Sequence, residues 1–213
     1  EAGPSVALPR EAALERAERI AIRSGALRGS ISLTGGRIDD LHLENYRETL
    51  EPGSDTVTLL SPTRAPDPYF VVYGWLRTQS GAPGPLPGPS TEWQAESGGE
   101  ALTPETPVTP VWEHDEGLVF RRTNAPDDRY MFTVRQSVEN TSGEPVALAP
   151  YGYIARRGEP DTQGFFILHE GAVGVFDGEL SEVDYDELLD LPPNRLEGGR
   201  VEATGVNANG WLG

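Results

Sequence analysis

The sequence predicts an all-β protein whose antiparallel strands form a sandwich. Many short segments alternate apolar and polar residues, which is the pattern of a strand with one buried and one solvated face. The 213 residues include 25 glycines and 19 prolines, and this composition favours many turns. A chain of this length can bury a substantial core as one large domain or two small ones.

The N-terminal segment differs from the rest. Residues 11–20 are rich in the helix formers alanine, glutamate and arginine, but the segment is short and has few large apolar side chains. We therefore predict a flexible or partly helical leader over residues 1–22, followed by a β-domain over residues 23–213.

Residues 30–43 predict a β-hairpin. Alternating segments flank residues 35–36, both glycine, and a glycine pair can adopt the positive φ angles that match the twist of paired strands. On the return strand, Ile38 is out of phase with Leu41. This shift predicts a β-bulge near the two aspartates at residues 39–40.

The rest of the chain predicts further short strands, a loop and an acidic segment. The clear alternation at 130–140 predicts a strand with one solvated face, whereas 146–155 and 165–169 are apolar on both faces and predict central strands. The stretch 77–91, rich in proline and glycine, predicts a surface loop within one domain, with a linker between domains as the alternative. The acidic, amphipathic segment 179–191 predicts a short helix. Strands are also expected at residues 56–60, 69–76, 108–113 and 118–123.

Composition argues against several functions. The chain has 17 basic residues, all arginine, and 34 acidic residues, so its formal charge is −17. This charge argues against nucleic-acid binding and against adsorption to anionic lipid. Without lysine or cysteine there is no Schiff-base or thiol chemistry, no disulfide and no cysteine zinc site. No segment approaches the ~20 apolar residues of a membrane-spanning helix, so this chain is not expected to be embedded in a membrane.

No catalytic, cofactor-binding or metal-binding residue is predicted. His114 and His169 each have an acidic neighbour, but adjacent residues on a strand point to opposite faces, so a structural role is favoured for both. The acidic segment 179–191 lacks the central glycine of a calcium loop and is expected to be a solvated face. A sandwich also fits a carbohydrate-binding or mutarotase-like protein, which would need a histidine and a carboxylate facing one cleft. The aromatic residues that could line such a cleft are Tyr73, Trp75, Trp93, Trp112, Phe165 and Phe166, although core packing is the favoured role for them.

A succession of short motifs runs along the chain. It begins with Gly-Ser-Ile-Ser-Leu-Thr-Gly-Gly-Arg-Ile-Asp-Asp-Leu-His-Leu-Glu-Asn-Tyr at 29–46 and ends with Gly-Trp-Leu-Gly at 210–213. The motifs between them lie at 57–62, 73–75, 102–104, 117–122, 128–134, 150–156 and 167–174. In order and spacing, over about residues 20–213, they resemble the large periplasmic domain of the bacterial membrane protein insertase family YidC, and its alphaproteobacterial form most.

The resemblance implies a fold, a location and a function. The family's domain is a β-supersandwich similar to galactose mutarotase, with short helical segments. It lies in the periplasm between the first two membrane helices of a multi-pass inner-membrane protein. The family domain continues past the last motif, so the sheet of this chain is expected to be incomplete at its C-terminus. The implied function is that of a non-catalytic domain, without cofactor or metal, of an insertase that inserts and folds inner-membrane proteins alone or with the Sec translocon. The domain itself is expected to dock partners or to make chaperone-like contacts.

The resemblance also implies partners and a binding edge. In the family, one edge of this domain has been linked to the Sec accessory protein SecF, and by position that edge corresponds to residues 164–191 and 210–211 here. SecD and nascent membrane proteins are the other implied partners, with no nucleic acid. The candidate partner-binding residues are Phe166, His169, Glu170, Asp184, Tyr185, Asp186, Leu188 and Trp211.

Overall fold

A computed structural model describes residues 7–78, 84–96, 101–158, 169–176, 179–190 and 210–212; the side chains of residues 176, 188–190 and 210–212 are not described. The described residues are mostly β-strand, which confirms the predicted all-β class. The elements in chain order are α1 (Arg10–Leu14), β1 (Arg19–Arg23), β2 (Leu27–Ser32), β3 (Arg37–Arg47), β4 (Thr56–Leu60), β5 (Tyr69–Arg77), β6 (Gln94–Ala95), β7 (Ala101–Leu102), β8 (Pro110–His114), β9 (Leu118–Pro126), β10 (Phe132–Asn140), β11 (Leu148–Arg156), β12 (Gly171–Phe176), β13 (Glu179–Asp184), α2 (Tyr185–Asp190) and β14 (Gly210–Leu212).

The chain divides into two compact units, Glu1–Arg157 and Gly158–Gly213. The first unit holds α1 and β1 to β11, and the second holds β12, β13, α2 and β14. The stretch 77–91 leads from β5 to β6, so it joins strands of one unit, as predicted. The sequence pattern predicts one β-domain over residues 23–213 and does not distinguish the second unit.

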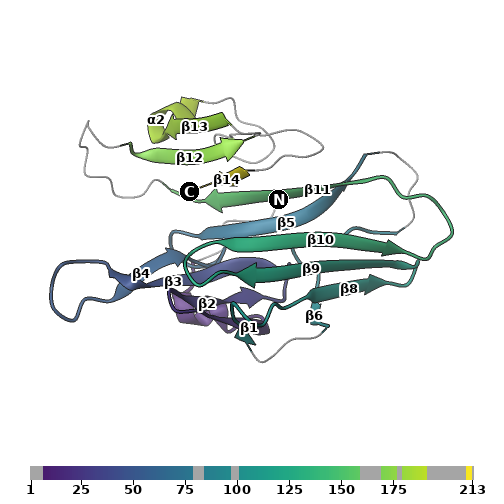
Figure 1. Ribbon diagram of the computed structural model, residues 1–213, viewed down its shortest axis with the longest axis horizontal. Coiled ribbons are helices and arrows are strands. Elements are labelled where there is room, and N and C mark those ends of the chain that lie inside the picture. The colour runs from purple at the N-terminus through teal and green to yellow at the C-terminus, as the bar shows by residue number, and fades with distance from the viewer. Residues whose placement is uncertain are drawn as a thin grey trace. The chain divides into compact units, whose positions relative to one another are not determined.

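The larger sheet of the first unit has seven strands in the order β11-β5-β3-β2-β1-β7, with β4 also paired to β3. Figure 1 labels all of these strands except β7. Its pairs are antiparallel except that of β1 with β7. β1 begins at Arg19, inside the range predicted as leader, and its Ile20 and Ile22 are part of the buried core. Burial of these β-branched side chains outweighs the helix propensity of the residues before them.

The hairpin of β2 and β3 has the predicted turn and bulge. Gly35 and Gly36 have φ angles of +73° and +60°, which a side chain would disfavour. The register of β3 shifts at Asp39, the extra residue between the partners of Ser30 and Ile31. The bulge leaves Asp39 and the aspartate after it both buried.

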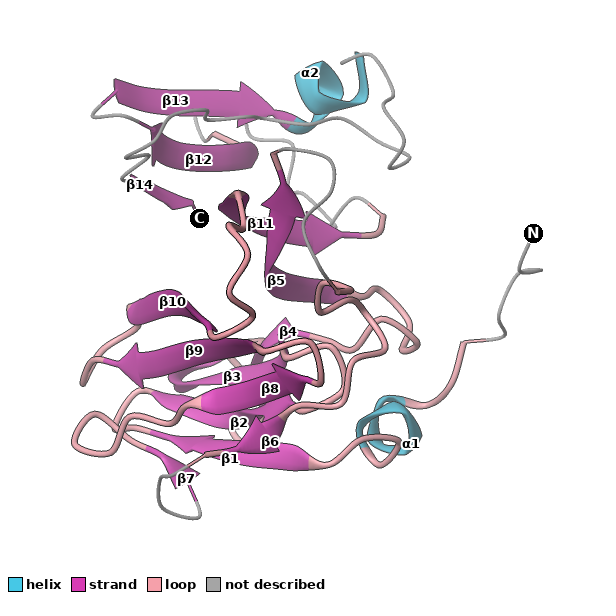
Figure 2. Cartoon of the chain, turned by 90° about the vertical axis from the view of Figure 1, so that its right-hand side faces the viewer, coloured by secondary structure: helices cyan, strands magenta, loops and turns pink. Residues whose placement is uncertain are grey.

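The second sheet of the first unit has the order β10-β9-β8-β6 and lies over the strands of the larger sheet (Figure 2). Side chains from both sheets form one core. At its centre the Phe120 ring of β9 meets the Trp75 ring of β5 edge-on, with ring centres 5.0 Å apart. Half-buried and exposed residues alternate along β10 from Phe132 to Glu139, as predicted for 130–140. The two layers form the predicted sandwich.

Two predicted elements are wrong. β11 pairs only with β5 among the described strands, so it lies at the edge of the described sheet and not in the central position predicted for 146–155. The segment 179–191, whose pattern predicts a helix, begins as strand β13, and only Tyr185–Asp190 is helical. β13 forms because β12 offers it an antiparallel partner along its whole length. Of the strand predicted at 165–169, residues 165–168 lie outside the described residues and His169 is not in a strand.

Candidate functional site

The predicted partner-binding residues belong to the second unit, which is built on a three-stranded sheet. The strand order is β13-β12-β14, so β12 pairs on both sides and β13 pairs on one side only among the described strands. A Cβ atom on Gly171 would lie 2.1 Å from the carbonyl oxygen of Val183. Glycine at this position therefore permits the close approach of β12 and β13 at the end where the predicted residues lie.

Four predicted residues meet where β12 begins and β13 ends. Nδ1 of His169 lies 3.0 Å from a carboxylate oxygen of Asp184. The backbone N–H of Tyr185 donates to the carbonyl oxygen of Glu170 at 3.1 Å. Nε2 of His169 lies 3.3 Å from the carbonyl oxygen of Ala172. The first two contacts join the segment before β12 to the end of β13 and the start of α2, and the third is local to β12.

The other predicted residues are placed only in part. Asp186 lies in the first turn of α2, where a negative charge interacts favourably with the helix dipole. Leu188 lies in α2, and Trp211 lies in β14 opposite Val175, but neither side chain is described. Phe166 lies outside the described residues. The geometry therefore brings together four of the eight predicted residues, those at 169–170 and 184–185.

The surface along β13 and α2 is acidic. No arginine occurs anywhere between residues 169 and 190. We name the exposed acids of this surface the acidic edge: Glu179, Glu182, Asp184, Asp186 and Glu187. Such a surface repels nucleic acid and anionic lipid, and it attracts a partner that presents basic side chains.

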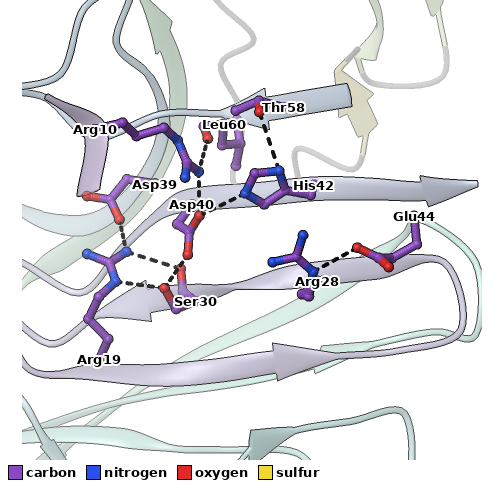
Figure 3. A network of polar contacts seen from close by, with 10 residues as sticks. All are labelled: Arg10, Arg19, Arg28, Ser30, Asp39, Asp40, His42, Glu44, Thr58 and Leu60. Atoms are coloured by element: carbon purple, nitrogen blue, oxygen red, sulfur yellow. Dashed lines mark hydrogen bonds and ion pairs between the residues drawn. The ribbon is translucent and has the colours of Figure 1, made fainter. Parts of the chain in front are cut away.

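A second polar site, which the sequence did not predict, lies in the first unit (Figure 3). The bulge in β3 buries Asp39 and Asp40, which are 3% and 8% exposed. Arg19 of β1 pairs with Asp39, and Arg10 of α1 pairs with Asp40. We name this site the buried cluster, and its members are Arg10, Arg19, Ser30, Asp39, Asp40 and His42.

Asp39 is held by arginines from two strands. Nε of Arg19 donates to the Ser30 hydroxyl at 2.7 Å while its Nη2 pairs with Asp39. Nε of Arg37 lies 3.9 Å from the second carboxylate oxygen. Burial raises the pKa of Asp39, and the adjacent Arg19 acts in the opposite direction. The carboxylate is thus an internal partner and not a free acid at the surface.

Asp40 collects donors from three elements. Arg10 and the Ser30 hydroxyl donate to its carboxylate, and Nε2 of His42 lies 3.5 Å away. Arg10 also donates to the carbonyl oxygen of Leu60 at 3.2 Å, so one side chain ties α1 to both β3 and β4. Burial, together with the positive charge of Arg10, lowers the pKa of His42. The buried cluster fastens the N-terminal helix to the sheet.

Arg122 of β9 is a buried cation with no ion-pair partner among the described residues. Its guanidinium donates to the carbonyl oxygens of Gly36, in the turn between β2 and β3, and of Tyr73, in β5 of the larger sheet. It lies 4.8 Å from the ring centre of Trp93 and 5.9 Å from that of Trp75. Burial lowers the pKa of Arg122 to about 10. Arg122 therefore links the two sheets through carbonyl hydrogen bonds and cation–π contacts.

The alternation of β9 contained a signal for this link. Leu118, Phe120, Arg122 and Asn124 follow one another at the inward positions of the strand, and all four are buried. An arginine in an otherwise inward series predicts a buried cation. The partners of Arg122 come from distant segments, so no local pattern identifies them.

The described residues hold no group of three or more histidine or acidic side chains that could bind a metal. Two surface pockets, of about 360 and 290 Å³, are lined by no histidine. His114 accepts a hydrogen bond from the N–H of Glu116 at 3.3 Å and its ring lies 5.6 Å from that of Trp112, contacts of a structural residue.

Among the described residues, no helix has the length and apolarity needed to cross a membrane.

Known proteins similar to this chain share one description. The family model for the YidC periplasmic domain matches residues 19–213. The membrane protein insertase YidC of Dinoroseobacter shibae is 53% identical over 100% of this chain and 35% of its own length. Those of a Ruegeria and a Jannaschia species are each 52% identical, over 87% and 100% of this chain and 30% and 34% of their own lengths. The chain thus spans about a third of the length of these relatives.

Proposed function

The chain belongs to the YidC periplasmic domain family, and from this premise we propose that it is a non-catalytic docking domain of a membrane protein insertase. The family match over residues 19–213 is the observation that carries the proposal. The family places the chain in the periplasm. The insertase that contains it would insert and fold membrane proteins of the inner membrane, alone or with the Sec translocon.

We assign the docking role to the acidic edge. The support is its charge, its exposure, and the single pairing of β13 among the described strands. A partner segment with basic side chains can complement the carboxylates, and an extended segment can add to the side of β13 that no described strand pairs. The proposed partners are the Sec accessory subunits SecF and SecD, with nascent membrane proteins as transient ones. In this proposal the residues before β1 form a leader. This leader includes α1, and Arg10 of α1 holds it to the first unit.

The experiment is a matched pair of charge-neutralised variants in the full-length insertase. One variant carries Asp184→Asn, Asp186→Asn and Glu187→Gln on the acidic edge. The control carries Glu48→Gln, Glu51→Gln and Asp55→Asn, which remove the same charge from the hairpin between β3 and β4. Co-purification of the Sec subunits from membranes is then compared with that of the unaltered protein.

We expect the edge variant to lose association with the Sec subunits and the hairpin variant to keep it. Because both variants change the net charge equally, a loss in both would reflect general electrostatics. Retention of every partner by the edge variant would contradict the docking role of the acidic edge. The family assignment does not favour the carbohydrate-binding alternative.

A further inference from the structure

We propose that a surface pocket of the first unit binds a small zwitterion that carries a phosphate group and an ammonium group. The pocket has a volume of about 360 Å³. It lies between α1, β4, the loop after β4, the start of β5 and the end of β11, and it shares only Arg10 with the buried cluster. Its polar lining residues are Arg10, Thr58, Ser61, Asp67, Tyr69 and Arg156.

The pocket contains opposite charges that do not neutralise each other. Arg156 and Asp67 both line it, yet neither takes part in an ion pair among the described residues. The Arg156 guanidinium instead lies over the Tyr69 ring, 5.3 Å from its centre. This contact keeps the cation at the pocket wall. Because the two charges share one pocket without touching, a ligand with both charges can bridge them.

Arg10 adds a second guanidinium to the pocket, and Asp40 is its ion-pair partner. Its Nε is buried and has no hydrogen-bond partner among the described residues, although its Nη2 donates to Asp40 and to Leu60. A ligand in the pocket does not reach this buried Nε, so an anion there meets the part of the Arg10 guanidinium that lines the pocket. Two guanidinium groups and the hydroxyls of Thr58 and Ser61 offer more donors than a carboxylate accepts, so they fit phosphate better.

Asp67 has a strained backbone at the same pocket. Among the described residues it is the only non-glycine residue with a positive φ, at +48°. Its neighbour Pro68 restricts its backbone further. The surrounding backbone holds the loop, because Ser61 and Tyr69 exchange hydrogen bonds of 2.8 and 3.0 Å and Pro68 accepts one from Arg157 at 2.9 Å. Such strain persists at ligand-binding loops, and here it places a carboxylate at the pocket, opposite in charge to an ammonium group.

The test is a titration of the isotope-labelled 213-residue chain with O-phosphoethanolamine, followed by NMR shifts of the backbone amides. We expect saturable shifts at residues that line the pocket. Arg156→Gln and Asp67→Asn should each weaken binding roughly tenfold, because each removes one charged contact. Arg64→Gln is the matched control, since this exposed arginine does not line the pocket and its loss should leave the affinity unchanged. If Asp67→Asn misfolds, Asp67→Gly removes the carboxylate and suits the positive φ.

Separate probes decide the chemistry and the source of the ligand. Ethanolamine alone and inorganic phosphate alone should each bind more weakly than O-phosphoethanolamine. Equal binding of inorganic phosphate with no effect of Asp67→Asn would show a simple anion site and overturn the proposal, as would the absence of shifts at the pocket. Sedimentation with phosphatidylethanolamine vesicles that Arg156→Gln abolishes assigns the ligand to a lipid headgroup. Binding of the soluble probe without vesicle binding assigns it to a free metabolite.

Discussion

The two compact units differ in where their side chains lie. In the first unit, the side chains of two sheets meet in a common core, and Ile22, Leu118 and Phe120 are fully buried. In the second unit, the described side chains of β13 and α2 are half-buried or exposed, and Leu180 is 62% exposed. The first unit is therefore held by its own core, whereas the second presents most of its described edge to solvent.

The two units also differ in whether their acidic side chains are buried and paired or exposed. In the first unit, Asp39 and Asp40 are occupied by arginines inside the fold. On the acidic edge, only Asp184 has an ion-pair partner among the described residues, and that partner is His169. Charges that stabilise the fold are thus paired and buried, and charges available to a partner are exposed. Substitutions in the two units should separate stability from binding.

The largest expected effect is that of Phe120→Ala in the core. Phe120 is fully buried and its ring contacts those of Trp75 and Trp112, with centres 5.0 and 5.6 Å away. Its truncation should lower the free energy of unfolding by about 3–5 kcal/mol. Leu180→Ala in the second unit should change it by less than about 0.5 kcal/mol. Urea unfolding followed by tryptophan fluorescence measures the stability of both variants. Equal losses would contradict the difference between the two units.

Arg122→Met should cause the next largest loss in the free energy of unfolding. It leaves the carbonyl oxygens of Gly36 and Tyr73 without their donor, which costs about 1–3 kcal/mol. The neighbouring Arg121 is its matched control, because that side chain pairs with two surface glutamates instead. Arg121→Met should destabilise less in the same urea experiment. A larger loss for Arg121→Met would contradict the role assigned to the buried cation.

Arg10→Gln tests the fastening of α1. Removing the guanidinium breaks its contacts with Asp40 and Leu60 and should cost about 1 kcal/mol. Hydrogen exchange should accelerate first at the amides of α1, because Arg10 is the link from the helix to β3 and β4. Arg16→Gln, at an exposed arginine just after the helix, should leave exchange unchanged. Unchanged exchange in Arg10→Gln would show that other contacts hold the helix.

His42 predicts a smaller, pH-dependent effect. Its folded-state pKa is below the ordinary value of 6.5, first because of burial and then because of Arg10; the charges of Asp40, Arg28 and Glu44 also act on it. Between the two pKa values the unfolded chain binds more protons than the folded chain, so the free energy of unfolding rises with pH. The unaltered chain should therefore lose stability relative to His42→Gln as the pH falls through 6.5. Urea unfolding at a series of pH values measures this difference, and a constant difference would contradict the pKa direction.

The smallest expected effect on stability is that of neutralising the acidic edge. Asp186→Asn with Glu187→Gln should change the free energy of unfolding by less than about 0.5 kcal/mol, because both residues are exposed. Urea unfolding provides the measurement. A loss as large as that of Arg122→Met would mean that the edge supports the fold, and its charge would then need no partner to explain it.

Local patterns predicted the parts of the fold that depend on neighbours in sequence. The glycine turn and the bulge at Asp39 follow from spacing within one hairpin. Strand β1 was not predicted, because its Ile20 and Ile22 are buried by residues far along the chain. The amphipathic pattern of 179–191 predicted a helix where β13 forms, because pairing with β12 is not visible in that local pattern.

The buried cluster and the predicted partner-binding residues show the same limit of local sequence patterns. The bulge indicated where two aspartates lie, but the arginines that meet them come from α1 and β1. Of the predicted partner-binding residues, the structure brings His169 and Glu170 next to Asp184 and Tyr185, although strands β12 and β13 separate the two pairs along the chain. That grouping came from the family resemblance, since no spacing rule connects the two positions. Their role in docking stays a prediction.

The most direct test of the difference between the units is site-specific photo-crosslinking in the full-length insertase in native membranes. Crosslinkers at Glu182 and Asp186 report on the acidic edge, and crosslinkers at Glu51 and Arg135, also exposed, report on the first unit. We predict crosslinks to a Sec subunit or a nascent membrane protein from the acidic edge and none from the first unit. Equal crosslinking from both units, or none from the acidic edge, would contradict the account.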